Sequence, residues 1–204
     1  MQLNKLTAIS PIDGRYRKKL EALSNYFSEF ALIKYRVFVE IQYFIALWEL
    51  EIPQLSKLSK NSVENIEQIF LGFSIEDAMC IKEIEEKINH DVKAVEYFIK
   101  DKFDELGLSK FKEFVHFGLT SQDINNTAIP LILKNFTTDY YLNKLFEVRN
   151  QLQVLIEKCE GVSVLARTHG QPASPTKLDK EIKVFKVRID EQIKILKNNL
   201  YASK

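Results

Sequence analysis

Apolar side chains recur every three or four residues along most of the chain, starting at Ser24. This spacing places them on one face of an α-helix, and Pro53 is expected to end the first such helix. The apolar positions of this helix are Phe27, Phe30, Ile33, Val37, Ile41, Phe44, Ile45 and Trp48.

The same period predicts three more helices before Gly107. One carries Val63, Ile66, Ile69 and Phe70 and ends near Gly72. The next begins at Ser74 with acidic residues in its first turn, as a helix N-terminus favours. The third has one apolar face and ends near Gly107; its apolar residues are Val92, Val95, Phe98, Ile99 and Phe103.

The second half of the chain predicts longer helices. A nearly continuous helix is expected from Ser121 to about Glu160, with a kink or break at Pro130. A loop follows over residues 161–177, and a last helix starts near Thr176. No segment shows the sustained alternation of a strand, so the chain is predicted to be all-α.

Two domains are expected. Residues 1–109 form a small N-terminal helical domain, and residues 110–204 form the first part of a central helical-bundle domain. Helices as long as those of the second half need other helices to pack against, including helices of other subunits.

Composition narrows the function classes. The 29 Lys and Arg residues nearly balance the 28 Asp and Glu residues, which argues against nucleic acid as a partner. No apolar run is long enough to cross a membrane, and the N-terminus lacks the basic start and apolar run of a signal peptide. Cys80 and Cys159 lie far apart, so neither a disulfide nor a zinc site is expected, and a cytoplasmic protein is predicted.

Candidate chemistry falls in four short runs at helix starts or in loops, at residues 10–19, 88–97, 116–126 and 166–172. Helix starts matter because their free N–H groups bind anions. Thr120 and Ser121, with Asp123 in the first turn, fit either a simple helix cap or a carboxylate or phosphate site. In "INHDV", Asn89 is expected to cap a helix that has His90 in its first turn.

Of the two remaining runs, residues 10–19 are cationic and residues 166–172 place a histidine in a loop. Arg15 and Tyr16 follow an Asp-Gly turn, and they are either solvent-exposed surface residues or residues that bind a phosphate. His169 lies beside Gly170 and two residues before Pro172, which hold it in place. Imidazole exchanges protons near neutral pH, so His169 is the best single candidate for proton transfer.

Taken together, "SPIDGRY", "NHDVKAVEYF", "EFVHFGLTSQDINN" and "RTHGQPASP" resemble the motifs of the bacterial-type adenylosuccinate lyases, a family of the fumarase and aspartase superfamily. The resemblance spans essentially the whole chain. It implies β-elimination of fumarate from adenylosuccinate to give AMP, and from the succinylated carboxamide ribotide (SAICAR) to give AICAR, in purine biosynthesis. It also implies no metal or organic cofactor and a homotetramer in which three subunits build each active site.

The resemblance implies a role for each matching residue. His169 is the general acid that protonates the departing nitrogen, His90 assists from the neighbouring domain, and Thr168 and Gln171 flank the acid. The implied substrate-binding residues are Arg15 and Tyr16 for the nucleotide phosphate, Asn89 and Asp91 around His90, Thr120 and Ser121 for the succinyl carboxylate, and Gln122 and Asp123 in support of that turn.

One family motif is missing. The flexible Gly-Ser-Ser-x-Met-Pro loop, which the resemblance implies carries the base serine, does not occur, since the only methionines are Met1 and Met79. We therefore expect an N-terminal fragment of such a lyase that is inactive alone. The alternatives are another lyase of the superfamily, such as argininosuccinate lyase or fumarase, and a noncatalytic helical scaffold of the same fold.

Overall fold

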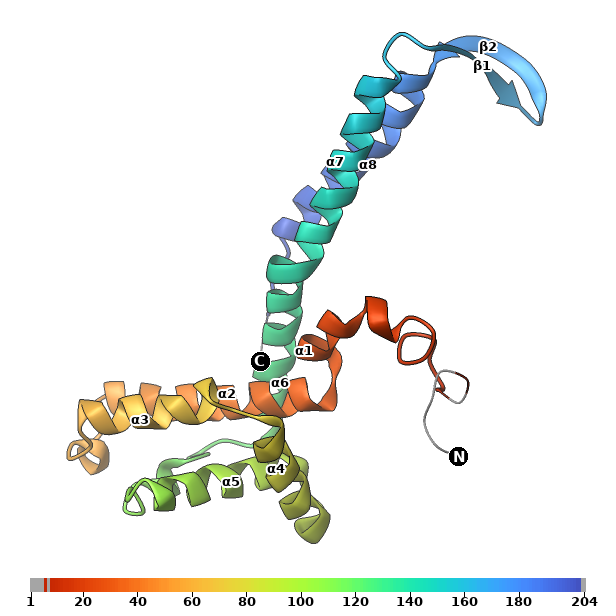
Figure 1. The fold of residues 1–204 in the computed structure, drawn as a ribbon. Helices are drawn as coiled ribbons and strands as arrows, with labels where there is room; N and C mark the ends of the chain where they lie inside the picture. Colours follow the sequence, from red (N-terminus) through yellow and green to blue (C-terminus); the bar gives the residue numbers. More distant parts are fainter. Residues whose placement is uncertain (1–5, 7, 203–204) are drawn as a thin grey trace. The chain divides into compact units, whose positions relative to one another are not determined.

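The computed structural model describes residue 6 and residues 8–202, which fall into two compact units. The first unit comprises the described residues up to Leu133 together with Ala202, and the second spans Lys134–Tyr201. Each unit is a set of helices, and the expected all-α class is confirmed apart from one small sheet (Figure 1). The expected domain boundary between residues 109 and 110 stays a prediction.

Among the described residues, the first unit contains five α-helices and most of a sixth, α6, whose last two residues belong to the second unit. Short 3₁₀ turns precede or separate some of them, at Arg17–Lys19, Glu21–Leu23, Pro53–Leu55 and Lys112–Phe114. The helices are α1 (Ser24–Phe27), α2 (Glu29–Glu49), α3 (Lys60–Leu71), α4 (Ile75–Ile88), α5 (Asp91–Glu105) and α6 (Ser121–Asn135).

The first long helix begins later than expected. Ser28 has an extended backbone, and its hydroxyl accepts a hydrogen bond from the N–H of Ala31, so it caps α2. The segment before it forms the separate short helix α1, and Phe27 is exposed instead of lying on the buried face. The prediction of one helix from Ser24 was wrong because the apolar period continues across this cap.

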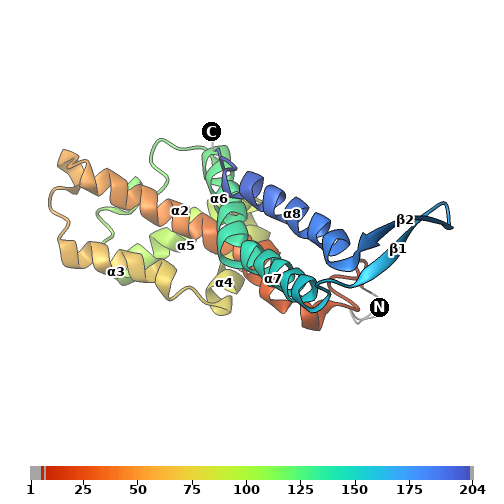
Figure 2. The same ribbon diagram turned by 90° about the horizontal axis from the view of Figure 1, so that it is seen from above.

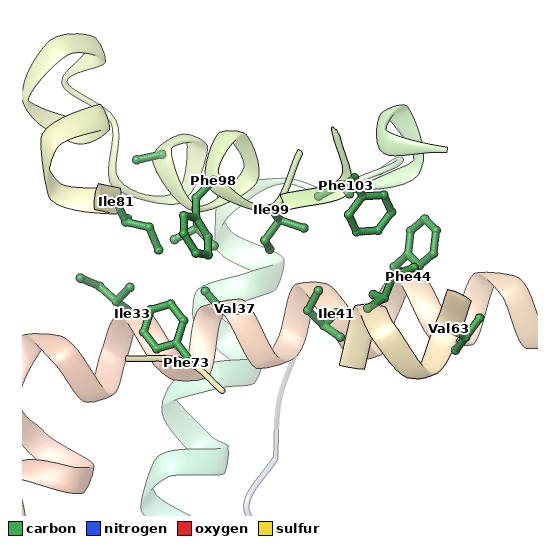
Figure 3. Packing of buried hydrophobic residues seen from close by; sticks show 14 of the residues in the cluster. Ile33, Val37, Ile41, Phe44, Val63, Phe73, Ile81, Phe98, Ile99 and Phe103 are labelled. Carbon is green, nitrogen blue, oxygen red and sulfur yellow. The ribbon is translucent and has the colours of Figure 1, made fainter. Parts of the chain in front are cut away.

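The core of the first unit lies between α2 and α5, with α3 and α4 beside them (Figure 3). Along α2, Ile33, Val37, Ile41 and Phe44 are all buried, as their spacing predicts. The ring of Phe44 meets that of Phe103 edge to face at 4.9 Å. The apolar face expected for α5 is confirmed as well: Val92, Val95, Phe98, Ile99 and Phe103 are buried.

The second unit is an antiparallel pair of long helices, α7 (Leu142–Lys158) and α8 (Leu178–Lys197), which lie side by side in both views (Figures 1 and 2). Arg149 of α7 and Lys186 of α8 both donate to the carboxylate of Asp190. Apolar side chains remain exposed on both helices, including Val148, Leu155, Phe185 and Ile195.

The backbone stays helical past Pro130, which lies inside α6. Of the kink or break expected at this proline, a break is therefore excluded. The irregularity comes later, as a π-helical turn at Phe136–Tyr141. This turn brings the ring of Phe136 to 5.6 Å from that of Tyr141 in a stacked arrangement.

The expected loop between the last two helices is instead a β-hairpin. Strand β1 (Ser163–Thr168) pairs antiparallel with β2 (Gln171–Lys177). The pairing is irregular: Arg167 pairs with Pro172 and Leu165 with Pro175, so β2 has one extra residue, a β-bulge. In the described part of the chain, no helix has the length and apolarity needed to cross a membrane.

Candidate functional site

The start of α5 is built around the imidazole of His90. Asn89 ends α4 in the left-handed region, with φ of 53°, and His90 takes the N-cap position of α5. Its Nδ1 accepts a hydrogen bond of 3.1 Å from the backbone N–H of Lys93. The expectation that Asn89 caps this helix was wrong, because the left-handed turn at Asn89 moves the cap one residue along.

The start of α6 carries the second group of candidate residues. The helix begins at Ser121, and Thr120 precedes it. The N–H and hydroxyl of Thr120 both donate to Oδ2 of Asp123 at 2.8 Å, so Asp123 supports the turn as expected from its place in the first turn. Gln122 donates to Asn126 one turn later.

These two helix starts meet. Nε2 of His90 lies 3.5 Å from Oγ of Ser121, at the outer limit of a hydrogen bond. Because Nδ1 accepts from the N–H of Lys93, Nε2, which faces Ser121, is the ring nitrogen that can donate. Sequence reasoning named both residues, and the structure brings them together.

A buried arginine that the sequence analysis missed ties these helix starts together. Arg36 of α2 is 8% exposed. Its Nη2 donates to Oδ2 of Asp91 at 2.6 Å, and its Nε donates to Oδ1 of Asn125 on α6 at 2.9 Å. Burial alone would raise the pKa of the Asp91 carboxyl, but the N–H of Val92 and the charge and hydrogen bond of Arg36 outweigh it and lower that pKa.

A second buried charge on α2 was also missed. Glu40, one turn after Arg36, is fully buried, and its Oε1 lies 2.5 Å from Nδ1 of His116. The hydrogen bond to Glu40 raises the pKa of His116, against the effect of burial. His116 has a left-handed backbone, with φ of 59°, and it begins the turn that leads to Thr120.

Arg15 and Tyr16 lie in the turn before the first 3₁₀ segment, and both are exposed. The guanidinium of Arg15 lies over the ring of Tyr16, 5.4 Å from its centroid. The neighbouring Arg17 is paired with Asp13 at 2.9 Å. Within the described part of the chain, no hydrogen bond or ion pair joins Arg15 or Tyr16 to His90 or Ser121.

The remaining candidates lie in the second unit, at the tip of the hairpin. His169 and Gly170 have positive φ of 50° and 77° and form the two-residue turn, and Thr168 pairs with Gln171 on either side of it. Two successive positive φ angles define a type I′ turn, which matches the twist of paired strands. The imidazole of His169 is thereby held, exposed, at the end of a paired ribbon.

Chemically, the first unit presents the imidazole of His90 and the hydroxyl of Ser121 where two helix starts meet. Such groups bind an anion and stabilise negative charge as it develops. The second unit presents a separate imidazole, suited to proton transfer.

Comparison with known proteins places the chain among lyases. The model of a family described as "Lyase" matches residues 14–202. The chain is 49% identical over 205 residues to the adenylosuccinate lyase of Dictyostelium discoideum, covering 98% of this chain and 44% of that protein. The adenylosuccinate lyase of Escherichia coli is 39% identical over 198 residues, covering 96% of this chain and 43% of that protein. The chain thus spans less than half the length of these relatives.

Solved structures agree on the fold. The fumarate lyase of Mesorhizobium sp. BNC1 matches with a TM-score of 0.70 at 19% identity, over 87% of this chain and 39% of that one. A β-carboxy-cis,cis-muconate cycloisomerase from Acinetobacter calcoaceticus sp. ADP1 matches with a TM-score of 0.65 at 18% identity, over 87% of this chain and 40% of that one.

Proposed function

The chain belongs to the lyase family whose model it matches over residues 14–202, and we propose that it supplies the N-terminal part of the active site of an adenylosuccinate lyase. The reaction is the elimination of fumarate from adenylosuccinate to give AMP, and from SAICAR to give AICAR. The observation that supports the proposal is the contact between His90 and Ser121 at two helix starts, because it brings together two of the motifs that resemble the family.

The start of α6 binds a carboxylate of the succinyl group. Removal of a proton from carbon β to the amine builds negative charge on that carboxylate, and fixed N–H and O–H donors stabilise it. Ser121 donates directly, and Thr120, Gln122 and Asp123 hold the turn. His90, flanked by Asn89 and Asp91, faces the same surface through Nε2–H.

His169 is the general acid. As the C–N bond breaks, its electron pair passes to the nitrogen, and the imidazolium of His169 gives that nitrogen its proton. The hairpin turn holds the ring in place, and Thr168 and Gln171 orient the substrate on either side. Arg15 and Tyr16 bind the phosphate, since a guanidinium and a phenol donate together to its oxygens.

The base that takes the carbon-bound proton is not among these residues, and no Ser-Ser-x-Met-Pro sequence occurs in the 204 residues. We propose that it comes from a further segment in a cytoplasmic homotetramer, in which different subunits share each site. The exposed apolar side chains of α7 and α8 support packing of this kind, because they would be buried against other helices. The chemistry proposed here uses no metal or organic cofactor.

A hybrid enzyme tests the proposal. This chain would replace the 44% of the Dictyostelium discoideum relative that it matches, and the hybrid would be assayed for fumarate release from adenylosuccinate. Cleavage by the hybrid and none by the 204-residue chain alone is the expected result. An assembled hybrid with no cleavage would contradict the proposal.

A further inference from the structure

Resting on the proposed function, we infer that Arg36 is a positioning residue that fixes the start of α5 against the start of α6 and so sets His90 opposite Ser121. It acts through Asp91 and Asn125 and is not expected to touch substrate.

The contacts of Arg36 carry this inference. Its guanidinium donates from two different nitrogens to two different helices, at 2.6 Å to Asp91 and at 2.9 Å to Asn125. Asp91 is the first residue of α5, next to His90, and Asn125 lies one turn beyond Ser121 in α6. Each contact is therefore within one helical turn of the residue that it positions.

Burial makes these contacts specific. A buried guanidinium needs acceptors for its N–H groups. If either contact were lost, an N–H group would be buried without a hydrogen bond. The planar fork of arginine also fixes the angle between its two partners, which a lysine ammonium, a single point charge, does not. Arg36 therefore favours one spacing of the two helix starts over neighbouring ones.

The direct test is the contact between His90 and Ser121 in the 204-residue chain, observed by NMR without ligand. Two readouts would be recorded: the NOE from the His90 ring to the Ser121 β protons, and the change in the His90 Nε2 chemical shift caused by Ser121→Ala. The variants are Arg36→Met, Arg36→Lys and Asn125→Ala. Arg149→Met, which breaks the pairing with Asp190 in the second unit, is the matched control.

The NOE and the Ser121→Ala response should be lost in Arg36→Met, reduced in Arg36→Lys and Asn125→Ala, and unchanged in Arg149→Met, while the amide spectrum of the α2–α5 core persists. Wild-type readouts in folded Arg36→Met would overturn the inference. If Arg36→Met does not fold, wild-type readouts in Asn125→Ala would do so. Because neither substrate nor turnover is used, this result is independent of whether the hybrid enzyme cleaves adenylosuccinate.

Discussion

The imidazole of His90 lies 3.5 Å from the hydroxyl of Ser121, across 31 positions of sequence, and each residue stands at the start of a different helix. The same imidazole caps its own helix through Nδ1. His90 therefore caps its helix through one ring nitrogen and faces Ser121 with the other, and the structural role can be separated from the proposed catalytic one by substitution.

His90→Ala should lower the free energy of unfolding by about 0.5–2 kcal/mol, because Lys93 loses its capping acceptor. His90→Asn should cost much less, since an asparagine side chain also caps helices well. Urea unfolding of the two variants measures the difference. In the hybrid enzyme, both variants should lose turnover; wild-type turnover in His90→Asn would remove the imidazole from the reaction.

His169→Asn should separate the chemistry of the hairpin tip from its backbone geometry. Asparagine followed by glycine is a favoured pair for a type I′ turn, so the hairpin should keep its amide chemical shifts. Turnover of the hybrid should fall by about 100-fold or more, as expected for loss of a general acid. Unchanged turnover with an intact hairpin would show that another group protonates the nitrogen.

Arg15→Met should raise the KM of the hybrid enzyme about ten-fold or more, because a hydrogen bond to a charged phosphate contributes about 1.5–3 kcal/mol. Arg17→Met is the matched control: it removes an exposed arginine from the same turn, one already paired with Asp13. Equal KM values for the two variants would argue against phosphate binding by Arg15.

The stability of the chain should depend on pH through Glu40 and His116. The pKa of His116 is raised in the folded state by its hydrogen bond to Glu40. The stabilisation that His116 gains from Glu40 is therefore fully present below its unfolded pKa of about 6.5. This stabilisation is lost as the pH rises through the pKa of His116 in the folded state.

Urea midpoints measured from about pH 6 to about pH 9 should fall in the wild type and fall less in Glu40→Gln, whose amide carries no charge. Glu29→Gln is the control, since Glu29 is an exposed residue of the same helix, paired with Lys82. Parallel pH profiles for the wild type and Glu40→Gln would show that the Glu40–His116 pair does not govern the pH dependence of stability.

Much of the helical architecture follows from the sequence because burial on one face imposes the helical period. For this reason the predicted apolar residues of α5 and the central ones of α2, from Ile33 to Phe44, are buried. The hairpin was missed because its strands contain Pro172 and Pro175 and are mostly exposed, so no alternating pattern marks them. His-Gly is also a weaker turn signal than Asn-Gly.

Sequence reasoning named the candidate residues, but not the contacts between them. Nothing in the spacing of His90 and Ser121 indicates that they meet, because that contact depends on how α2, α5 and α6 pack. Arg36 and Glu40 were overlooked as ordinary charges in a long helix. A signal was present, because Arg36 lies three residues after Ile33 and Glu40 three residues after Val37, the spacing of the buried face.

The most direct test of the account is the rate of fumarate release from adenylosuccinate by the assembled hybrid enzyme, compared with the same hybrid carrying His169→Asn. We predict measurable turnover in the first and a loss of about 100-fold or more in the second. A hybrid that assembles but releases no fumarate, or one whose rate does not depend on His169, would contradict the assignment of this chain as part of a lyase active site.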